Sequence, residues 1–120
     1  MPATATVSGN AGPGVKCANL ELRQDAAQVL VDGARLELTE REFQLLAALV
    51  DRRDRVVPRA ELYSAVWRRR MAYRDRSVDV FVRKLRLKLH EIAPGWEYIH
   101  THFGIGYRFS ARPAPPGADA

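Results

Sequence analysis

The sequence has a single cysteine and no long apolar run, and these shortages exclude several classes of protein. Cys17 cannot form an internal disulfide, which favours a reducing compartment. No apolar stretch approaches the ~20 residues that a membrane-spanning helix needs. The opening, MPATATVSGN, lacks the basic and hydrophobic segments of a signal peptide. We therefore expect a cytoplasmic chain with no membrane partner.

Residue clusters typical of metal sites and enzymes are also missing. The three histidines and the cysteine do not follow the paired C-x-x-C or H-x-x-x-H spacing of metal ligands, so we expect no metal and no cofactor. Asp75 and Asp79 lie on one side of a predicted helix, but no nucleophile with a base accompanies them. The sequence predicts no enzyme. Asp79 is instead expected to orient Arg76 or Arg83 through an intrahelical pair.

Positive charge is concentrated in one segment. The formal net charge is +5 and the pI is about 9.9, which favours an anionic partner such as nucleic acid, ahead of an acidic protein or membrane face. Residues 68–88 hold nine basic residues against Asp75 and Asp79, a local net charge of +7. The rest of the chain therefore sums to −2, and the basic character belongs to one segment.

Both ends of the chain are rich in small residues and proline, so we expect flexible tails at 1–14 and 111–120 around one domain at 15–110. Between residues 15 and 38 the segments VKCANLELRQD, QVLVDG and ARLEL are rich in strand-forming residues. Asp32 and Gly33 tolerate the positive φ of a two-residue hairpin turn. The pattern predicts a small antiparallel sheet.

Two helices are expected next. Thr39 and Glu42 have capping-box spacing at the start of TEREFQLLAALVDRR, and the apolar stripe that follows has helical spacing. Pro58 fits the first turn of a second helix, which ends near Trp67. Residues 68–75, RRRMAYRD, form a polar loop that is longer than a tight turn requires. It is either a solvated connector or a binding loop.

A third helix is predicted over residues 75–90, and it has two different faces. Val78, Val82, Leu85 and Leu89 cluster on one side as a buried stripe. The opposite side is basic but carries apolar residues as well. A solvated helix usually mixes charge signs, so this face is either a solubilising surface or a surface for DNA, where Arg and Lys contact phosphates or guanine. After it, residues 97–110 predict a β-hairpin with a glycine-rich tip.

The order of these segments resembles the DNA-binding effector domain of OmpR/PhoB-type response regulators. The resemblance rests on LTEREFQLLAAL, ELYSAVW, DRSVDVFVRKLRLKL and GIGYRF, and it covers Val15 to about Ser110. It implies an α+β fold: a winged helix-turn-helix with an N-terminal antiparallel β-sheet, three helices and a C-terminal β-hairpin wing. In that family the domain usually follows a phosphorylatable receiver of a two-component system. Residues 1–14 are then interdomain linker if the chain is a fragment.

The resemblance also implies partners and contact residues. Double-stranded DNA is the expected partner, bound by the third helix in the major groove and by the wing in the adjacent minor groove, with tandem protomers on direct repeats. The residues expected at DNA are Arg76, Ser77, Arg83 and Arg86 on phosphates, Val80, Phe81 and Lys84 near base edges, and Thr101, His102 and Phe103 on the wing. The loop expected to meet RNA polymerase or a neighbouring protomer comprises Arg68, Arg69, Arg70, Met71, Tyr73 and Arg74.

Three positions depart from the family pattern. Phe103, after His102, stands where the wing often carries an arginine, so either His102 substitutes or the wing binds differently. Phe81 occupies a position that is frequently polar, and Pro58 replaces the usual serine cap of the second helix. The alternative function is a winged-helix module that docks an acidic protein partner through the same basic surface.

Overall fold

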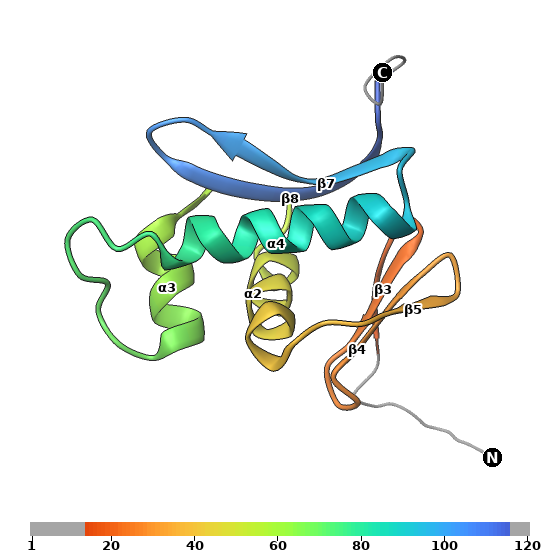
Figure 1. The fold of residues 1–120 in the computed structure, drawn as a ribbon, viewed down its shortest axis with the longest axis horizontal. Coiled ribbons are helices and arrows are strands. Elements are labelled where there is room, and N and C mark those ends of the chain that lie inside the picture. The colour runs from red at the N-terminus through yellow and green to blue at the C-terminus, as the bar shows by residue number, and fades with distance from the viewer. Residues whose placement is uncertain (1–13, 116–120) are drawn as a thin grey trace.

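The computed structural model describes residues 14–115, which form an α+β winged helix-turn-helix, as predicted. A four-stranded sheet near the N-terminus is followed by three helices and a C-terminal hairpin (Figure 1). Within these residues no helix is both long enough and apolar enough to cross a membrane. Of the tails predicted at 1–14 and 111–120, residues 1–13 and 116–120 lie outside the described residues.

The N-terminal sheet contains β2 (Val15–Cys17), β3 (Leu20–Arg23), β4 (Gln28–Val31) and β5 (Ala34–Leu36) in antiparallel order. Asp32 and Gly33 have φ values of 52° and 81°, as their predicted hairpin turn requires. The sequence did not indicate the turn between β2 and β3, where Ala18 has a φ of 55°. Ala18 has no side-chain signal for a left-handed conformation, so the segment looked like one strand.

Helix α2 (Glu40–Asp51) begins with the predicted capping box. The Glu42 backbone N–H donates to Thr39 Oγ1 over 3.2 Å, and the Thr39 N–H donates to Glu42 Oε1 over 2.9 Å. Both interactions satisfy N–H groups that have no partner within the helix. The apolar stripe of α2 is buried against α3, α4 and β8, so this helix forms the centre of the core.

Glu42 also has a partner that the sequence did not reveal. Its side chain is almost fully buried, and its Oε1 accepts a hydrogen bond from Lys88 Nζ over 2.6 Å. Spacing within α4 could not reveal this pair, because Glu42 lies in a different helix, 46 residues before Lys88. Burial alone would raise the pKa of Glu42, but the bonds from Lys88 and Thr39 outweigh it and hold the pKa below its usual value.

Replacing Glu42 by glutamine is expected to lower the free energy of unfolding at pH 7 by about 2 kcal/mol, because the salt bridge with Lys88 is lost. The folded-state pKa of Glu42 lies below the unfolded value of about 4.3. Its stabilisation is therefore complete above that value and disappears as the pH falls toward the folded-state pKa. Urea unfolding at pH 7 and pH 3 should show the difference from wild type shrinking with acid. The exposed Glu91→Gln is the control, and a difference independent of pH would contradict this account.

Strand β6 (Val57–Pro58) leads into helix α3 (Arg59–Trp67). Pro58 was predicted in the first turn of the helix, but it is the N-cap residue, with an extended backbone and no side-chain capping bond. Its ring fixes φ at −61°, and it belongs to strand β6, where it pairs with Gly106 of β8. The helix ends at Trp67, as predicted.

Helix α4 (Ser77–Ile92) begins and ends two residues later than predicted. The helix cannot begin at residue 75, because Arg74 has a left-handed φ of 60°. The Asp75 carboxylate also accepts a hydrogen bond from the backbone N–H of Ser77 over 2.8 Å. That carboxylate caps the helix from two residues before it. The predicted buried stripe is confirmed, with Val78, Val82, Leu85 and Leu89 at most 3% exposed.

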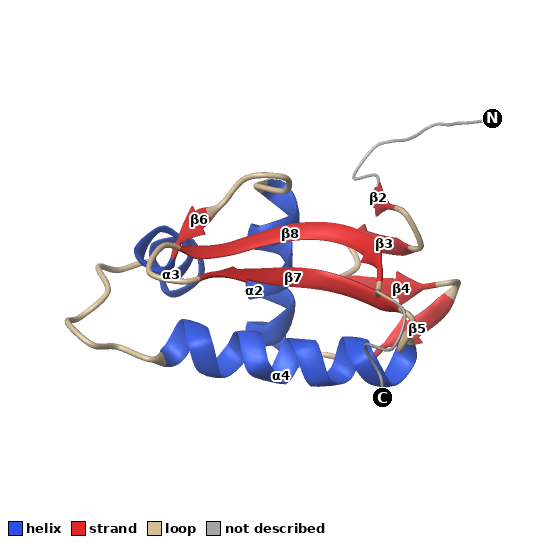
Figure 2. Ribbon diagram, turned by 90° about the horizontal axis from the view of Figure 1, so that it is seen from above, coloured by secondary structure: helices blue, strands red, loops and turns tan. Residues whose placement is uncertain are grey.

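The wing consists of β7 (Trp96–His102) and β8 (Gly106–Pro113), which join β6 in a sheet of order β6-β8-β7 (Figure 2). Strand β8 runs to Pro113, so residues 111–113 belong to the sheet and not to the predicted tail. The two ends of the domain are also linked, since Tyr98 Oη donates to Asn19 Oδ1 over 2.8 Å.

Candidate nucleic-acid interface

The outer face of α4 is exposed, as its spacing predicted. Arg83 and Lys84 are both exposed, and Val80 and Leu87 keep 47% and 60% of their surface open. Single exposed apolar residues are common on protein surfaces, so the informative feature here is their position beside two cations on one helix face. The face therefore combines two cations with two apolar groups over about two turns, a composition suited to the charged backbone and apolar base edges of a duplex.

Phe81 lies at the edge of this face and is half-buried. Its ring packs edge-on against Trp67 of α3 with centroids 5.6 Å apart, and Lys84 Nζ lies 4.8 Å from the Phe81 centroid. Trp67 in turn stacks on Tyr63 at 4.8 Å. This aromatic cluster holds the stem of Lys84 along the helix surface, so the ammonium has a preferred place on the exposed face.

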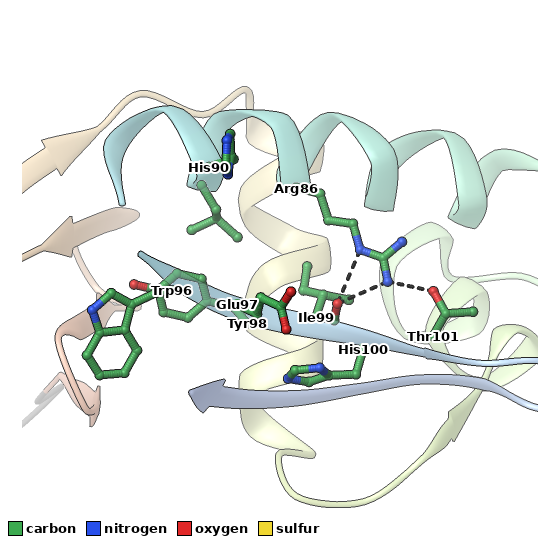
Figure 3. A pocket seen from close by; sticks show the side chains of 9 residues that line it. Arg86, His90, Trp96, Glu97, Tyr98, Ile99, His100 and Thr101 are labelled. Atoms are coloured by element: carbon green, nitrogen blue, oxygen red, sulfur yellow. Dashed lines mark hydrogen bonds between the residues drawn. The ribbon is translucent and has the colours of Figure 1, made fainter. Parts of the chain in front are cut away.

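The side chain of Arg86, which was expected to contact a DNA phosphate, points toward strand β7. Its Nε and Nη2 donate to the carbonyl oxygen of Ile99 over 3.2 and 3.0 Å, and Nη2 donates to Thr101 Oγ1 over 2.6 Å (Figure 3). The side chain is half-buried, and burial lowers the pKa of the guanidinium. The structure therefore places Arg86 and Thr101 in a contact between α4 and the wing.

Asp79 makes a second contact between α4 and the wing. Its carboxylate accepts a hydrogen bond from Arg59 Nε over 2.6 Å and another from the hydroxyl of Tyr107. It also forms an ion pair with Arg76, whose Nε lies 3.5 Å away. The predicted intrahelical pair is therefore the one with Arg76. Burial alone would raise the pKa of Asp79, but the bonds from Tyr107 and Arg59 keep it below its usual value, so the group stays ionised at neutral pH.

Tyr107 of β8 has two guanidinium groups close to its ring. Arg59 Cζ and Arg86 Cζ are 5.1 and 5.6 Å from its ring centroid. We call the set of Arg59, Asp79, Arg86, Thr101 and Tyr107 the wing clamp, because it joins α3, α4 and both wing strands. Its bonds are charge-assisted and partly shielded from water, which favours one fixed orientation of the wing on α4.

Sequence reasoning missed two members of the wing clamp. Arg59 was not singled out because a single arginine after proline has no distinctive pattern, and Tyr107 looked like an ordinary inward-facing strand residue. The available signal was that a buried tyrosine hydroxyl needs a partner, and Asp79 is the carboxylate that satisfies it.

The tip of the wing carries no cation. Phe103 is 91% exposed and Ile105 is 56% exposed, while His102 is half-buried. Gly104 adopts a φ of 78°, and the Ile105 N–H donates to the His102 carbonyl over 2.9 Å. The tip therefore presents apolar surface, and Phe103 is its most exposed part.

The loop between α3 and α4 presents most of its predicted residues to solvent. Tyr73 is 88% exposed, and Arg74 lies over its ring with Cζ 5.3 Å from the centroid. Met71 is half-buried against the core and anchors the loop. Arg69 donates to Tyr63 Oη over 3.0 Å, and the arginines of the loop are all exposed: Arg68, Arg69, Arg70 and Arg74.

No group of three or more His, Cys, Asp or Glu side chains gathers into a metal-binding arrangement within residues 14–115. The exposed surfaces predicted to bind partners are the α4 face, the wing and the loop between α3 and α4. These elements lie next to one another in the fold (Figures 1 and 2).

Comparison with known proteins gives a consistent result. Residues 33–109 match the model of the family described as transcriptional regulatory protein, C terminal. The chain is 38% identical over 95 residues to the transcriptional regulatory protein CreB of Escherichia coli K12. The matched region covers 79% of this chain and 42% of CreB. It is 36% identical over 92 residues to ResD of Bacillus subtilis, covering 76% of this chain and 38% of ResD. The chain thus spans about two fifths of the length of these curated relatives.

Solved structures agree with the sequence relatives. The RstA DNA-binding domain of Klebsiella pneumoniae, in complex with the RstA box, has a TM-score of 0.73 and 27% identity, covering 81% of this chain and 96% of that one. The DNA-binding domain of CpxR from E. coli also has a TM-score of 0.73, with 32% identity and coverage of 82% and 96%.

Proposed function

Because the chain belongs to the OmpR/PhoB-type family of transcriptional regulatory protein C-terminal domains, we propose that it is a sequence-specific double-stranded DNA-binding domain of a transcription regulator. The observation that carries this proposal is the exposed face of α4, where Arg83 and Lys84 stand between two exposed apolar side chains. The family is a class of DNA-binding domains and not a class of enzymes. Helix α4 enters the major groove, and the wing reaches the adjacent minor groove.

The structure supports different roles for the residues predicted at DNA. Arg76 and Arg83 are exposed and suited to phosphates, and Ser77, at the first turn of α4, lies beside them. Lys84 and Val80 are suited to base edges, with Phe81 supporting Lys84. Arg86 is assigned a different role from the one first expected: together with Thr101 it positions the wing.

Two further partners are proposed from the family. The loop with exposed Tyr73 and the arginines around it offers apolar surface next to cations, a combination suited to contact with RNA polymerase. Protomers are proposed to bind direct repeats in tandem, about one helical turn apart.

The test is to incubate the chain with a pool of random duplexes, recover what it retains over several rounds and sequence the product. The proposal predicts an enriched short motif, repeated at about one helical turn. Retention without enrichment would show backbone binding alone and contradict sequence specificity. Absence of retention at low salt would favour a module that docks an acidic protein instead.

Substituting Lys84 by alanine is expected to relax the recovered motif at one or two base pairs, where discrimination falls by about 1–2 kcal/mol. The reason is that a base contact specifies sequence, whereas a phosphate contact only positions the protein. The matched comparison is Arg76→Ala, whose side chain is 79% exposed and which should weaken all sequences alike. Binding measured on the motif and on its single-base variants distinguishes the two, and a uniform loss in both variants would contradict these roles.

A further inference from the structure

The wing tip, defined as Phe103, Gly104 and Ile105, exposes apolar surface without a charged or hydrogen-bonding side chain. Phe103 is 91% exposed and Ile105 56% exposed. Such a tip cannot neutralise a phosphate, and it offers no guanidinium to a narrow minor groove. The side chains of the tip can therefore contribute to DNA binding only through apolar contact and stacking.

The turn at the wing tip is fixed by its backbone. Gly104 supplies the left-handed φ of 78°, and the Ile105 N–H donates a hydrogen bond to the carbonyl oxygen of His102. His102 pairs with Gly106 across the hairpin. Gly106 is also held from its other side, because it lies directly against the backbone of Val57 in β6. Phe103 therefore projects from a short turn whose base is held by a third strand.

The wing clamp fixes this turn relative to the DNA-binding helix. Arg86 joins α4 to β7 through Ile99 and Thr101, and Asp79 joins α4 to β8 through Tyr107. The hairpin tip and the N-terminal end of α4 lie at the same end of the domain (Figures 1 and 2). When α4 occupies the major groove, the orientation of the wing tip is already determined, so its insertion costs little additional ordering entropy.

We propose that the wing tip is an apolar wedge, in which Phe103 enters the minor groove beside the α4 site and partly unstacks one base step. This inference rests on the proposed function. Aromatic and aliphatic side chains inserted between base steps open them and bend the duplex, and contact between the ring and the bases offsets the loss of stacking. Duplex DNA is favoured over a protein partner because the tip belongs to the same rigid unit as the cationic face of α4.

The experiment uses the 120-residue chain and a duplex carrying the motif recovered from the random pool, with 2-aminopurine placed in turn at each position of the flank that the wing would cover. Unstacking of this base raises its fluorescence. Wild type should raise the signal at one step, Phe103→Ala should abolish that rise and weaken binding about tenfold, or ~1.4 kcal/mol, and Phe103→Leu should retain part of both. The control is Gln24→Ala, which shortens an exposed, uncharged side chain in the turn between β3 and β4, outside the proposed interface.

The outcomes separate this inference from the function beneath it. Tight binding with no fluorescence rise at any position, or a rise that survives in Phe103→Ala, would overturn the wedge and leave DNA recognition intact. Weaker binding of Phe103→Ala without unstacking in wild type would also overturn it, by showing a groove contact alone. If wild type fails to bind any duplex, the proposed function itself fails. All these side chains are exposed, so unchanged thermal unfolding should accompany every variant.

Discussion

Replacing Gly106 by alanine is expected to destabilise the domain by about 3 kcal/mol or more, because an added Cβ would overlap the backbone of a neighbouring strand. A Cβ at this position would lie 1.9 Å from the carbonyl oxygen of Val57 and 2.9 Å from Cα of Pro58. Both are backbone atoms of β6, so no side chain can rotate away. Strand β6 would have to separate from β8, and its pairing at Val57 and Pro58 would be lost.

The measurement is urea unfolding followed by far-ultraviolet circular dichroism. Gly95→Ala is the matched control, because a Cβ there meets no atom within 4 Å and the backbone is not left-handed. It should leave the free energy of unfolding within about 0.5 kcal/mol of wild type. If Gly106→Ala were as stable as Gly95→Ala, the close approach of β6 to β8 would be contradicted.

Reversing two charges on the exposed face of α4 should have the largest effect on binding. The double variant Arg83→Glu and Lys84→Glu replaces two attractions to phosphates or base edges by repulsions, and we expect affinity for a single copy of the recovered motif to fall ~1,000-fold or more. Both side chains are exposed, so the fold should be retained. Fluorescence anisotropy with a labelled duplex measures the loss.

A matched double variant separates local contact from total charge. Lys16→Glu and Arg35→Glu change exposed residues of the N-terminal sheet and alter the formal charge by the same amount, from +5 to +1. Long-range attraction alone would make the two double variants equal, whereas contact through α4 predicts a much smaller loss for the sheet variant. Equal losses would contradict the assignment of α4 as the DNA-binding helix.

Local chemistry explains which parts of the fold could be predicted from the sequence. The capping box at Thr39 and Glu42, the turn at Asp32 and Gly33 and the buried stripe of α4 depend on neighbours a few residues away. The bond from Lys88 to Glu42 and the pairing of β6 with β8 join residues about fifty positions apart. No periodicity within either segment records such a contact.

The residues of the candidate site likewise fall into those that the sequence could predict and those that it could not. Helical spacing predicted that Arg83 and Lys84 face outward, because the opposite stripe is apolar. It could not predict the direction of Arg86, which sits on the flank of the helix and turns toward whatever packs there. That neighbour is the carbonyl of Ile99 in β7, and its position depends on the whole hairpin. Flanking positions of a helix are thus decided by tertiary structure.

The order of strands β6, β8 and β7 has a consequence for synthesis of the chain. Strand β6 has its partner fifty residues later, and Asn19 has its partner at Tyr98. A growing chain that ends before Gly106 therefore holds three helices and the N-terminal sheet but cannot close the sheet that carries the wing. The loops to be closed are long, so these contacts form late. During synthesis, the sheet that carries the wing can close only after β8 has emerged, and helix α4 gains its wing clamp only then.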